Sequence, residues 1–312
     1  MREKIIFELP SVSRENMLIR GYAFGSGRKS LCIVGSTRGN EIMQTYVCAL
    51  LVRKLKELES SGRLAENTQI LVIPSVNTAS MNVQKRFWPC DNTDINRMFP
   101  GYDKGETTQR IAAAVFDKIK DYDFGIQMAS FYQSGLFQTH VKMMDVAGFG
   151  TDHIRDFGLR CAVVRRPRPY DTTTLNYNWR LWDTCAFSLY TDCTDTIDEK
   201  AAEEAAEAVL RFMKINGMAR LDCGTSWNTR IVNEEELYPV RAGRGGFMSL
   251  HTEPGKRVKA GETLGQIIDP MDASVKEIVT SPCDGEVFFA SDRPLVLQDN
   301  VLFKIIAAAD HN

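Results

Sequence analysis

The sequence predicts an α/β domain with a mostly parallel β-sheet flanked by helices, followed by a small all-β domain. From about residue 18 to 217, strand-like apolar runs alternate with segments whose apolar residues recur at helical spacing, which is typical of parallel sheets with crossover helices. After about residue 224, short apolar runs are separated by Gly, Pro and Asp, and turn signals about every 8–12 residues indicate an all-β domain. We assign residues 1–223 to the first domain and 224–312 to the second.

The elements of the first domain follow from its apolar runs. Strands are expected at Leu31–Val34, Gln69–Val76, Phe124–Ala129, Val141–Met144, Leu159–Val164 and Cys185–Tyr190. Helices are expected at Glu41–Leu58, Thr107–Lys120 and Asp198–Asn216. Thr196 and Glu199 have the spacing of a capping box before the last helix, and Gly217 follows that helix where a left-handed residue commonly ends one. The long loop 77–106 lacks periodicity, and loops of this length are usually functional or disordered.

The second domain contains two passages of similar pattern, each with a turn, a Val, an apolar pair and a further turn. This pattern resembles the barrel-sandwich half-barrels of biotinyl and lipoyl carrier domains. Those carriers present a modified lysine in a tight hairpin. Lys276 lies near Met271 and Asp272, but the local motif differs, so we expect an accessory structural domain.

Composition excludes several classes of protein. The formal net charge of −2 argues against binding to nucleic acid or to a membrane surface. Eight cysteines occur without a C-x-x-C pair, which favours reduced thiols in a cytoplasmic protein over a disulfide framework or a zinc finger. No segment approaches the roughly 18 apolar residues of a membrane-spanning helix.

Several motifs occur in an order that resembles one enzyme family. They are Gly39-Asn40-Glu41, Ile73–Asn77, Arg86, Asp94-x-Asn96-Arg97, Phe99-Pro100-Gly101, "AGRGGF" at 242–247 and "SPCDGEV" at 281–287. Together they resemble the succinylglutamate desuccinylase/aspartoacylase family, which are zinc-dependent deacylases of N-acyl amino acids. The resemblance implies a zinc-carboxypeptidase-like fold for the first domain and leaves a homo-oligomer open.

The resemblance also implies a set of catalytic parts. In the family, a His and a Glu from an H-x-x-E motif and a second His ending a later strand hold zinc. A Glu from a T-x-E segment then acts as the general base on the metal-bound water. Three protein ligands leave the fourth position of Zn²⁺ open for that water, and the metal lowers its pKa toward about 7.

Three of these four positions are substituted in this sequence. Arg38 stands at the first His, Ala129 at the second His and Tyr190 at the general base, and Gln127 replaces a nearby Asp. Glu41 alone is retained. We therefore expect a divergent member that lacks the metal ligands and has no cofactor.

The four histidines do not restore the ligand set. They are His140, His153, His251 and His311. His140 could reach the site if the preceding loop folded back, but a polar residue at the start of a strand is the simpler interpretation. We expect His153 at the surface, His251 in the β domain and His311 in the terminal tail.

The substrate-binding positions are better preserved. By the resemblance, Asn96 and Arg97 bind a substrate carboxylate and Arg86 polarises the scissile carbonyl. We also place Arg38 among the substrate-binding residues. A planar guanidinium suits a carboxylate because it offers two parallel N–H donors. Arg97 could instead form an ion pair within its own loop, with Asp91 or Asp94.

A further basic run consists of Arg165, Arg166 and Arg168, with Tyr170 and Trp179 nearby. Such a run is usually a solvated surface, although it could also help to cover an acidic ligand.

Three functions are compatible with these residues. The leading hypothesis is a catalytically impaired protein that keeps a cleft for a small carboxylate such as an N-acyl amino acid. The second is an active hydrolase with Glu41 as base, Tyr190 as acid, and Arg38 and Arg86 as electrophiles. A covalent variant using Ser130, Cys90 or Cys193 lacks a His to serve as base. The third is a partner-binding protein that uses the β domain.

The loop before Glu41 gives a geometric prediction. Glu41 would carry an uncompensated charge in an enclosed site, which is costly, and Arg38 can supply the missing positive charge. We expect a contact of about 2.7–3.2 Å between their heavy atoms. The alternative is that Arg38 points to solvent and Glu41 merely begins its helix, where the dipole favours an acidic residue.

Overall fold

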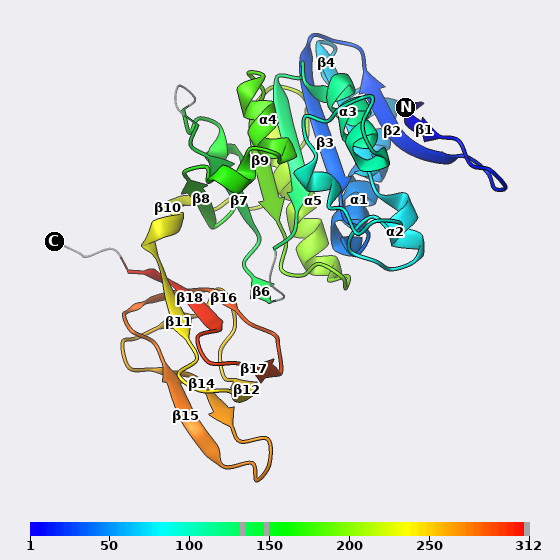
Figure 1. Ribbon diagram of the computed structural model, residues 1–312. Coiled ribbons are helices and arrows are strands. Elements are labelled where there is room, and N and C mark those ends of the chain that lie inside the picture. Colours follow the sequence, from blue (N-terminus) through cyan, green and yellow to red (C-terminus); the bar gives the residue numbers. More distant parts are fainter. Residues whose placement is uncertain (132–134, 147–149, 309–312) are drawn as a thin grey trace. The chain divides into compact units, whose positions relative to one another are not determined.

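The computed structural model of the protein describes residues 1–131, 135–146 and 150–308. These residues form two compact units (Figure 1). The first contains Met1–Ser130 and Thr139–Arg230, and the second contains Phe131–Gln138 and the chain from Ile231 onward. The second unit therefore includes a short segment that the sequence pattern does not separate from the first domain.

A mixed sheet forms the centre of the first unit, in the strand order β1-β2-β4-β3-β5-β9-β7-β8-β10, with β10 (Arg230–Asn233) as its edge strand. Its strands are β1 (Arg2–Leu9), β2 (Met17–Gly25), β3 (Lys29–Ser36), β4 (Thr68–Ser75), β5 (Phe124–Ala129), β7 (His140–Met144), β8 (Cys161–Arg165) and β9 (Cys185–Tyr190). The four central strands β4, β3, β5 and β9 are parallel. Antiparallel pairing occurs between β1 and β2, β2 and β4, and β7 and β9. This is the predicted α/β architecture, with antiparallel strands outside a parallel centre.

Helices cover both faces of the sheet (Figure 1). They are α1 (Ile42–Ser60), α2 (Thr78–Asn82), α3 (Thr107–Ile119), α4 (Leu175–Leu181) and α5 (Glu199–Ile215). Side chains alternate across a strand, so Cys32 and Val34 of β3 join α3 and α4 in one core cluster. Helix α1 packs against α5 and against β3 and β4.

All nine predicted elements of the first domain are present, with shifts of at most two residues at their ends. Strands β1 and β2 and helices α2 and α4 were not predicted. Helix α4 has only seven residues, too few for a clear helical period. Most side chains of β1 are exposed, so that strand lacks a continuous apolar run.

The predicted capping box before α5 is wrong. The N-cap is Asp198, whose carboxylate accepts a hydrogen bond from the Ala201 N–H at 2.9 Å. Asp198 lies directly before the first helical residue, where its short carboxylate can reach an unpaired N–H of the first turn. The predicted end of this helix is confirmed, because Gly217 follows it with φ of 67°.

The second unit consists of two antiparallel sheets, as predicted for an all-β domain. One sheet has the order β11-β18-β16-β13, with β6 paired to β16, and the other has the order β15-β14-β12-β17. The strands are β6 (Leu136–Phe137), β11 (Leu237–Arg241), β12 (Gly246–Leu250), β13 (Arg257–Val258), β14 (Thr263–Ile268), β15 (Val275–Thr280), β16 (Gly285–Ala290), β17 (Leu295–Val296) and β18 (Val301–Ala307). Buried apolar residues of both sheets form one cluster that includes Leu264, Val287 and Phe303.

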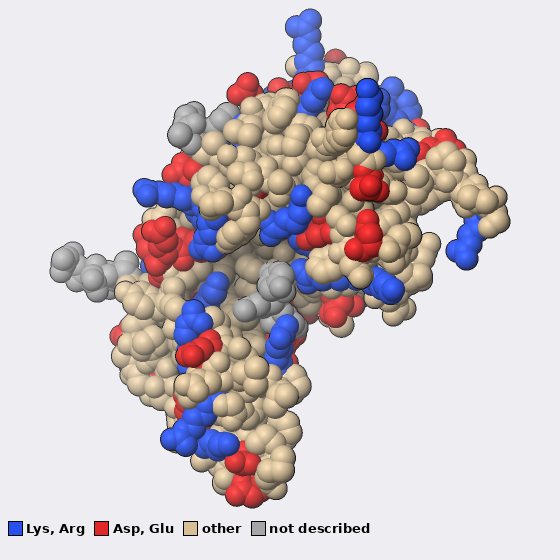
Figure 2. All heavy atoms as spheres, in the orientation of Figure 1, with Lys and Arg blue, Asp and Glu red and all other residues tan. Residues whose placement is uncertain are grey.

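The helices and the surface charge both bear on the sequence predictions. In the part of the chain that the structure describes, no helix is both long and apolar enough to cross a membrane. On the face seen in Figure 2, basic and acidic side chains are interspersed, in keeping with the net charge of −2.

Candidate functional site

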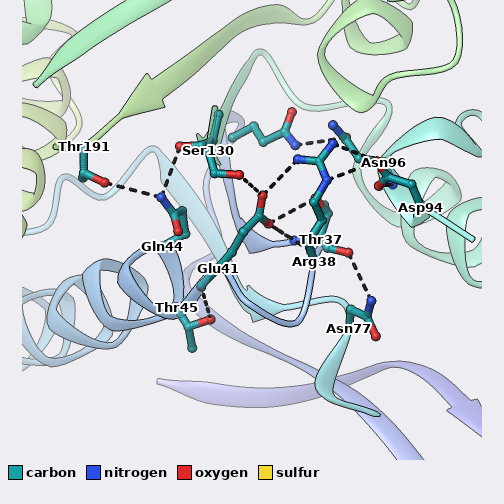
Figure 3. A network of polar contacts seen from close by, with 12 residues as sticks. Thr37, Arg38, Glu41, Gln44, Thr45, Asn77, Asp94, Asn96, Ser130 and Thr191 are labelled. Atoms are coloured by element: carbon teal, nitrogen blue, oxygen red, sulfur yellow. Dashed lines mark hydrogen bonds and ion pairs between the residues drawn. The ribbon is translucent and has the colours of Figure 1, made fainter. Parts of the chain in front are cut away.

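The candidate site lies at the carboxyl ends of the central parallel strands. Parallel strands end at the same edge of a sheet, and in open α/β sheets ligands bind outside that edge. Strand β3 ends at Ser36 and β5 ends at Ala129. The loop after β3 carries Arg38 and leads to Glu41, which is the N-cap residue of α1. Figure 3 shows the polar network that these residues form with the long loop after β4.

Glu41 is buried, with 1% of its surface exposed, and both of its carboxylate oxygens accept hydrogen bonds. Oε2 accepts from the backbone N–H groups of Thr37 and Arg38, at 2.8 and 2.9 Å. Oε1 accepts from Arg38 Nη1 at 3.0 Å and from the Ser130 hydroxyl at 2.5 Å. The carboxylate is thus fully enclosed by donors and does not merely begin a helix.

Arg38 points inward and joins two carboxylates from different loops (Figure 3). It is 7% exposed. In addition to its bond with Glu41, it donates from Nε and Nη2 to Asp94 Oδ2, at 3.1 and 2.9 Å. Burial alone would lower the pKa of Arg38, but the negative charges of Glu41 and Asp94 outweigh that effect and raise the pKa above its ordinary value. The expected Arg38–Glu41 contact is therefore present.

Asp94 connects this ion pair to the next residues of the long loop. Its Oδ1 accepts from the Asn96 N–H at 3.0 Å, so Asp94 caps the 3₁₀ turn η1 (Ile95–Arg97). The Asn96 side-chain oxygen accepts a bond from Gln127 Nε2 of β5 at 3.0 Å. The network thus extends from the end of β3 across β5 to the loop that carries Asn96 and Arg97.

Sequence reasoning missed two contributors to this network. Ser130 follows β5 directly, and the sequence indicates it only as a candidate nucleophile, whereas its hydroxyl donates to Glu41 in the structure. Gln44, one turn after Glu41 on α1, donates to the backbone oxygen of Ala129 at 3.2 Å. A polar residue at the end of a buried strand, and another on the buried face of a helix, were the signals available.

The predicted substrate-binding residues lie in different surroundings. Arg97 donates from Nη1 to the Tyr170 carbonyl oxygen at 2.5 Å, and its guanidinium lies 5.6 Å from the centre of the Tyr170 ring. Its alternative partner Asp94 is instead bound to Arg38. Arg86 is partly buried, with its guanidinium 5.5 Å from the centre of the Phe87 ring.

Tyr190 and His140 form a stacked pair on neighbouring strands. They are register partners of β9 and β7, and their rings lie 5.0 Å apart at an interplanar angle of 3°. His140 is fully buried, which agrees with its interpretation as a residue at the start of a strand. Of the other histidines, His153 is at the surface beside Asp156, His251 lies in the second unit, and His311 falls outside the described residues.

The basic run begins at the last residue of β8, and its members differ in exposure: Arg165 is partly buried, whereas Arg166 and Arg168 are exposed as expected. Arg165 makes two bonds of 2.6 Å to the carboxylate of Asp171, and Arg168 donates to the Tyr170 hydroxyl at 2.7 Å. Trp179 is fully buried. The expectation of a solvated surface is therefore wrong for Arg165, because Asp171 lies close enough to offset its charge.

The residues at the family's zinc positions do not fit a zinc ion. Arg38 places a cation beside Glu41, Ala129 has no donor atom, and both Glu41 oxygens already accept hydrogen bonds. Zinc sites in proteins use three or four His, Cys, Asp or Glu ligands. Within the described ranges, no group of three or more such residues is arranged to hold a metal.

The fold is shared with several solved structures. A succinylglutamate desuccinylase/aspartoacylase from Rhodobacter sphaeroides is 20% identical, with a TM-score of 0.76 over 96% of this chain and 92% of that one. The product-bound ectoine utilization protein EutE (DoeB) from Ruegeria pomeroyi is 14% identical, with a TM-score of 0.77 over 98% and 95%. A metallo-carboxypeptidase from Burkholderia cenocepacia is 10% identical, with a TM-score of 0.54 over 69% and 64%. These likenesses establish the predicted carboxypeptidase-like fold.

Comparison of the sequence with known families gives a more direct result. A search among curated proteins finds no match to the chain. Residues 27–130 match the family model described as the succinylglutamate desuccinylase/aspartoacylase catalytic domain. This segment runs from just before β3 to the end of β5 and contains Arg38, Glu41, Asp94 and Ala129. Over this segment, about a third of its length, the chain is therefore similar to the succinylglutamate desuccinylase/aspartoacylase catalytic domain.

Proposed function

We propose that this chain is a deacylase-like protein that binds a small carboxylate, such as an N-acyl amino acid, without zinc and with little or no hydrolysis. One observation carries the proposal: the only retained family ligand, Glu41, lies in a buried ion pair with Arg38 at 3.0 Å. A guanidinium cannot ligate a cation, since it offers N–H donors and no acceptor. We further propose that the protein acts in the cytoplasm.

The ligand class rests on the relatives and on the loop that carries Asn96 and Arg97. Arg97 uses one N–H in the bond to Tyr170, while a guanidinium carries five donors. One solved relative is described as product-bound. A carboxylate held by Arg97 and the neighbouring Asn96 amide is the chemistry that these donors favour.

Two measurements test the two halves of the proposal. Metal analysis of protein purified without chelator is expected to find far less than one zinc per chain. Calorimetric titration with N-acetylglutamate and related acyl amino acids is expected to show binding that Arg97→Ala weakens about ten- to a hundred-fold, the usual effect of losing a charge-assisted hydrogen bond. The exposed Arg53, which pairs with Glu203 on another surface, supplies the control Arg53→Ala.

Rebuilding the family's parts gives a stricter test of the zinc claim. The triple variant Arg38→His, Ala129→His and Tyr190→Glu has the three ligands and the base that zinc hydrolysis requires. It is expected to bind about one zinc per chain, whereas Arg38→His alone is not. Stoichiometric zinc or efficient zinc-dependent turnover in the unmodified protein contradicts the proposal.

A second candidate function follows from the short bond between Ser130 and Glu41. A serine hydroxyl 2.5 Å from a carboxylate has the partner that a nucleophile needs. The same Glu41 oxygen also accepts a hydrogen bond from Arg38 Nη1 at 3.0 Å, however, so it is not reserved for the serine hydroxyl. Covalent labelling by a fluorophosphonate that Ser130→Ala abolishes would establish this hydrolase, and absence of labelling supports the binding function.

A further inference from the structure

Arg38 also binds a second carboxylate, that of Asp94. This contact is not needed to offset the charge of Glu41. Two of its nitrogens, Nε and Nη2, bind Asp94 Oδ2, at 3.1 and 2.9 Å. Asp94 lies 56 residues further along the chain, in the long loop after β4. The guanidinium therefore ties the strand-end loop after β3 to the loop that carries the candidate ligand-binding residues (Figure 3).

Asp94 is the residue on which the geometry of that loop depends. Its second oxygen, Oδ1, caps the 3₁₀ turn through the Asn96 N–H at 3.0 Å, and its backbone oxygen accepts from the Arg97 N–H at 2.9 Å. Ile95, between them, is fully buried. A carboxylate held from one side by Arg38 and from the other by the turn has a defined orientation, and so do the residues that follow it.

The shape of the guanidinium is needed for this double contact. Its planar fork places N–H donors on separate edges, so one edge can bind Glu41 while another binds Asp94. An ammonium group is a compact point charge on a flexible stem. A lysine at position 38 can offset the charge of Glu41, but it does not offer the two-nitrogen contact to Asp94.

We propose that Arg38 is a positioning residue for ligand binding: through Asp94 it holds Asn96 and Arg97 in place. The inference rests on the proposed function, since Asn96 and Arg97 are the groups assigned there to the ligand carboxylate. Arg38 itself touches no ligand in this assignment and acts through Asp94.

The two roles of Arg38 separate in the variants Arg38→Lys and Arg38→Met. Arg38→Lys is expected to unfold at nearly the wild-type denaturant midpoint, because the charge beside Glu41 remains, yet to bind N-acetylglutamate about tenfold more weakly. Its Asn96 and Arg97 amides are expected to exchange hydrogen about tenfold faster. Arg38→Met is expected to lose both stability and affinity. Arg20→Lys, at an exposed ion pair with Glu3, is the matched control.

Asp94→Asn provides a second route if Arg38→Lys does not fold. It keeps an oxygen for the cap but removes the charge that Arg38 binds, and is expected to accelerate the same two amides. If Arg38→Lys or Asp94→Asn exchanges and binds like the wild type, the positioning role is wrong and Arg38 only offsets Glu41. If the wild type binds no acyl amino acid, the proposed function is wrong. The positioning role is tested separately: it is wrong if the Asn96 and Arg97 amides exchange hydrogen in the variants at the wild-type rate.

Discussion

Glu41, which the sequence resemblance places at a zinc-ligand position, lies in a buried ion pair with Arg38. Replacing one member of a buried pair usually costs about 3–5 kcal/mol, because the remaining charge is left without compensation. Arg38, Glu41 and Ala129 therefore have to be considered as one set. A single substitution toward the family pattern removes the existing stabilisation before it completes a ligand set.

The Arg165–Asp171 pair predicts an acid sensitivity in the first unit. Burial alone would raise the pKa of Asp171, but the hydrogen bonds from Arg165 and from the Arg168 N–H lower it below its ordinary value. The stabilisation is complete above the unfolded pKa of about 4 and is lost as the pH falls through the lower folded value. We expect Asp171→Asn to be less stable at pH 7 by about 3 kcal/mol, with a flatter dependence on pH between about 5 and 3.

Denaturant unfolding at a series of pH values measures this effect. Glu3→Gln, at an exposed pair with Arg20, is expected to change stability by less than about 1 kcal/mol. If the free energy of unfolding depends on pH equally in the wild type and in Asp171→Asn, the Arg165–Asp171 pair does not control the acid sensitivity of the first unit.

Two buried asparagines of α4 are expected to respond in opposite ways to replacement by leucine. Asn176 and Asn178 are each 2% exposed. Asn178 donates from Nδ2 to the carbonyl oxygens of Thr172 and Thr174 at 2.9 Å. Neither polar side-chain atom of Asn176 has a hydrogen-bond partner among the residues that the structure describes. An unpaired buried amide costs about 1–3 kcal/mol. We expect Asn176→Leu to equal or exceed the wild type in stability and Asn178→Leu to lose about 1–3 kcal/mol, as measured by thermal unfolding. If Asn176→Leu is less stable than the wild type, the Asn176 amide of the wild type has hydrogen-bond partners in solution.

At the scale of secondary-structure elements, the start of α5 shows how a cap is chosen. Thr196 and Glu199 match a common sequence pattern, yet Asp198 provides the cap. We expect Asp198→Ala to cost about 1 kcal/mol, the usual effect of losing an N-cap, and Thr196→Ala to change stability by less than about half that. Denaturant midpoints measure the stability of the two variants. A larger loss of stability in Thr196→Ala than in Asp198→Ala would show that Thr196 caps the helix.

The candidate site itself is assembled by elements. Strands β3 and β5 place Arg38 and Ser130 at one edge of the sheet because parallel neighbours end together. The long loop after β4 then supplies Asp94 and Asn96. Each element supplies only part of the network. The order of the strands therefore decides which of these residues meet, more than the spacing within any one motif does.

At the scale of the whole molecule, the second unit includes a segment from between β5 and β7. Phe137 of β6 pairs with Phe289 of β16 and its ring lies 4.6 Å from that of Phe289. Phe137 is 6% exposed, and truncating a buried Phe to Ala usually costs about 3–5 kcal/mol. We expect Phe137→Ala to destabilise the second unit more than the first.

Hydrogen exchange measures this difference between units. Amides of β16 and β18 are expected to exchange faster in Phe137→Ala, while those of β3 and β4 change little. Phe247→Ala, whose side chain is 45% exposed, is the control. Uniform acceleration in both units would show that they unfold as one.

The sequence by itself determined the fold class, the bounds of β5 and β9 and the all-β second unit. Its motifs, in a characteristic order, also indicated the family model that residues 27–130 match. It also indicated the Arg38–Glu41 contact. These features depend on residues close together in the chain, where apolar periodicity and short-range geometry act. Their physical causes can be read without knowing which strands are neighbours.

Only the tertiary structure decided which distant residues meet. It brought Asp94 to Arg38, Gln127 to Asn96 and Phe137 into the second unit. Such contacts depend on strand order and on the path of a long loop, and neither leaves a periodic signal in the sequence. The same charged residues, with another strand order, would meet different partners, because an ion pair needs its two groups within about 4 Å and does not depend on their separation along the chain.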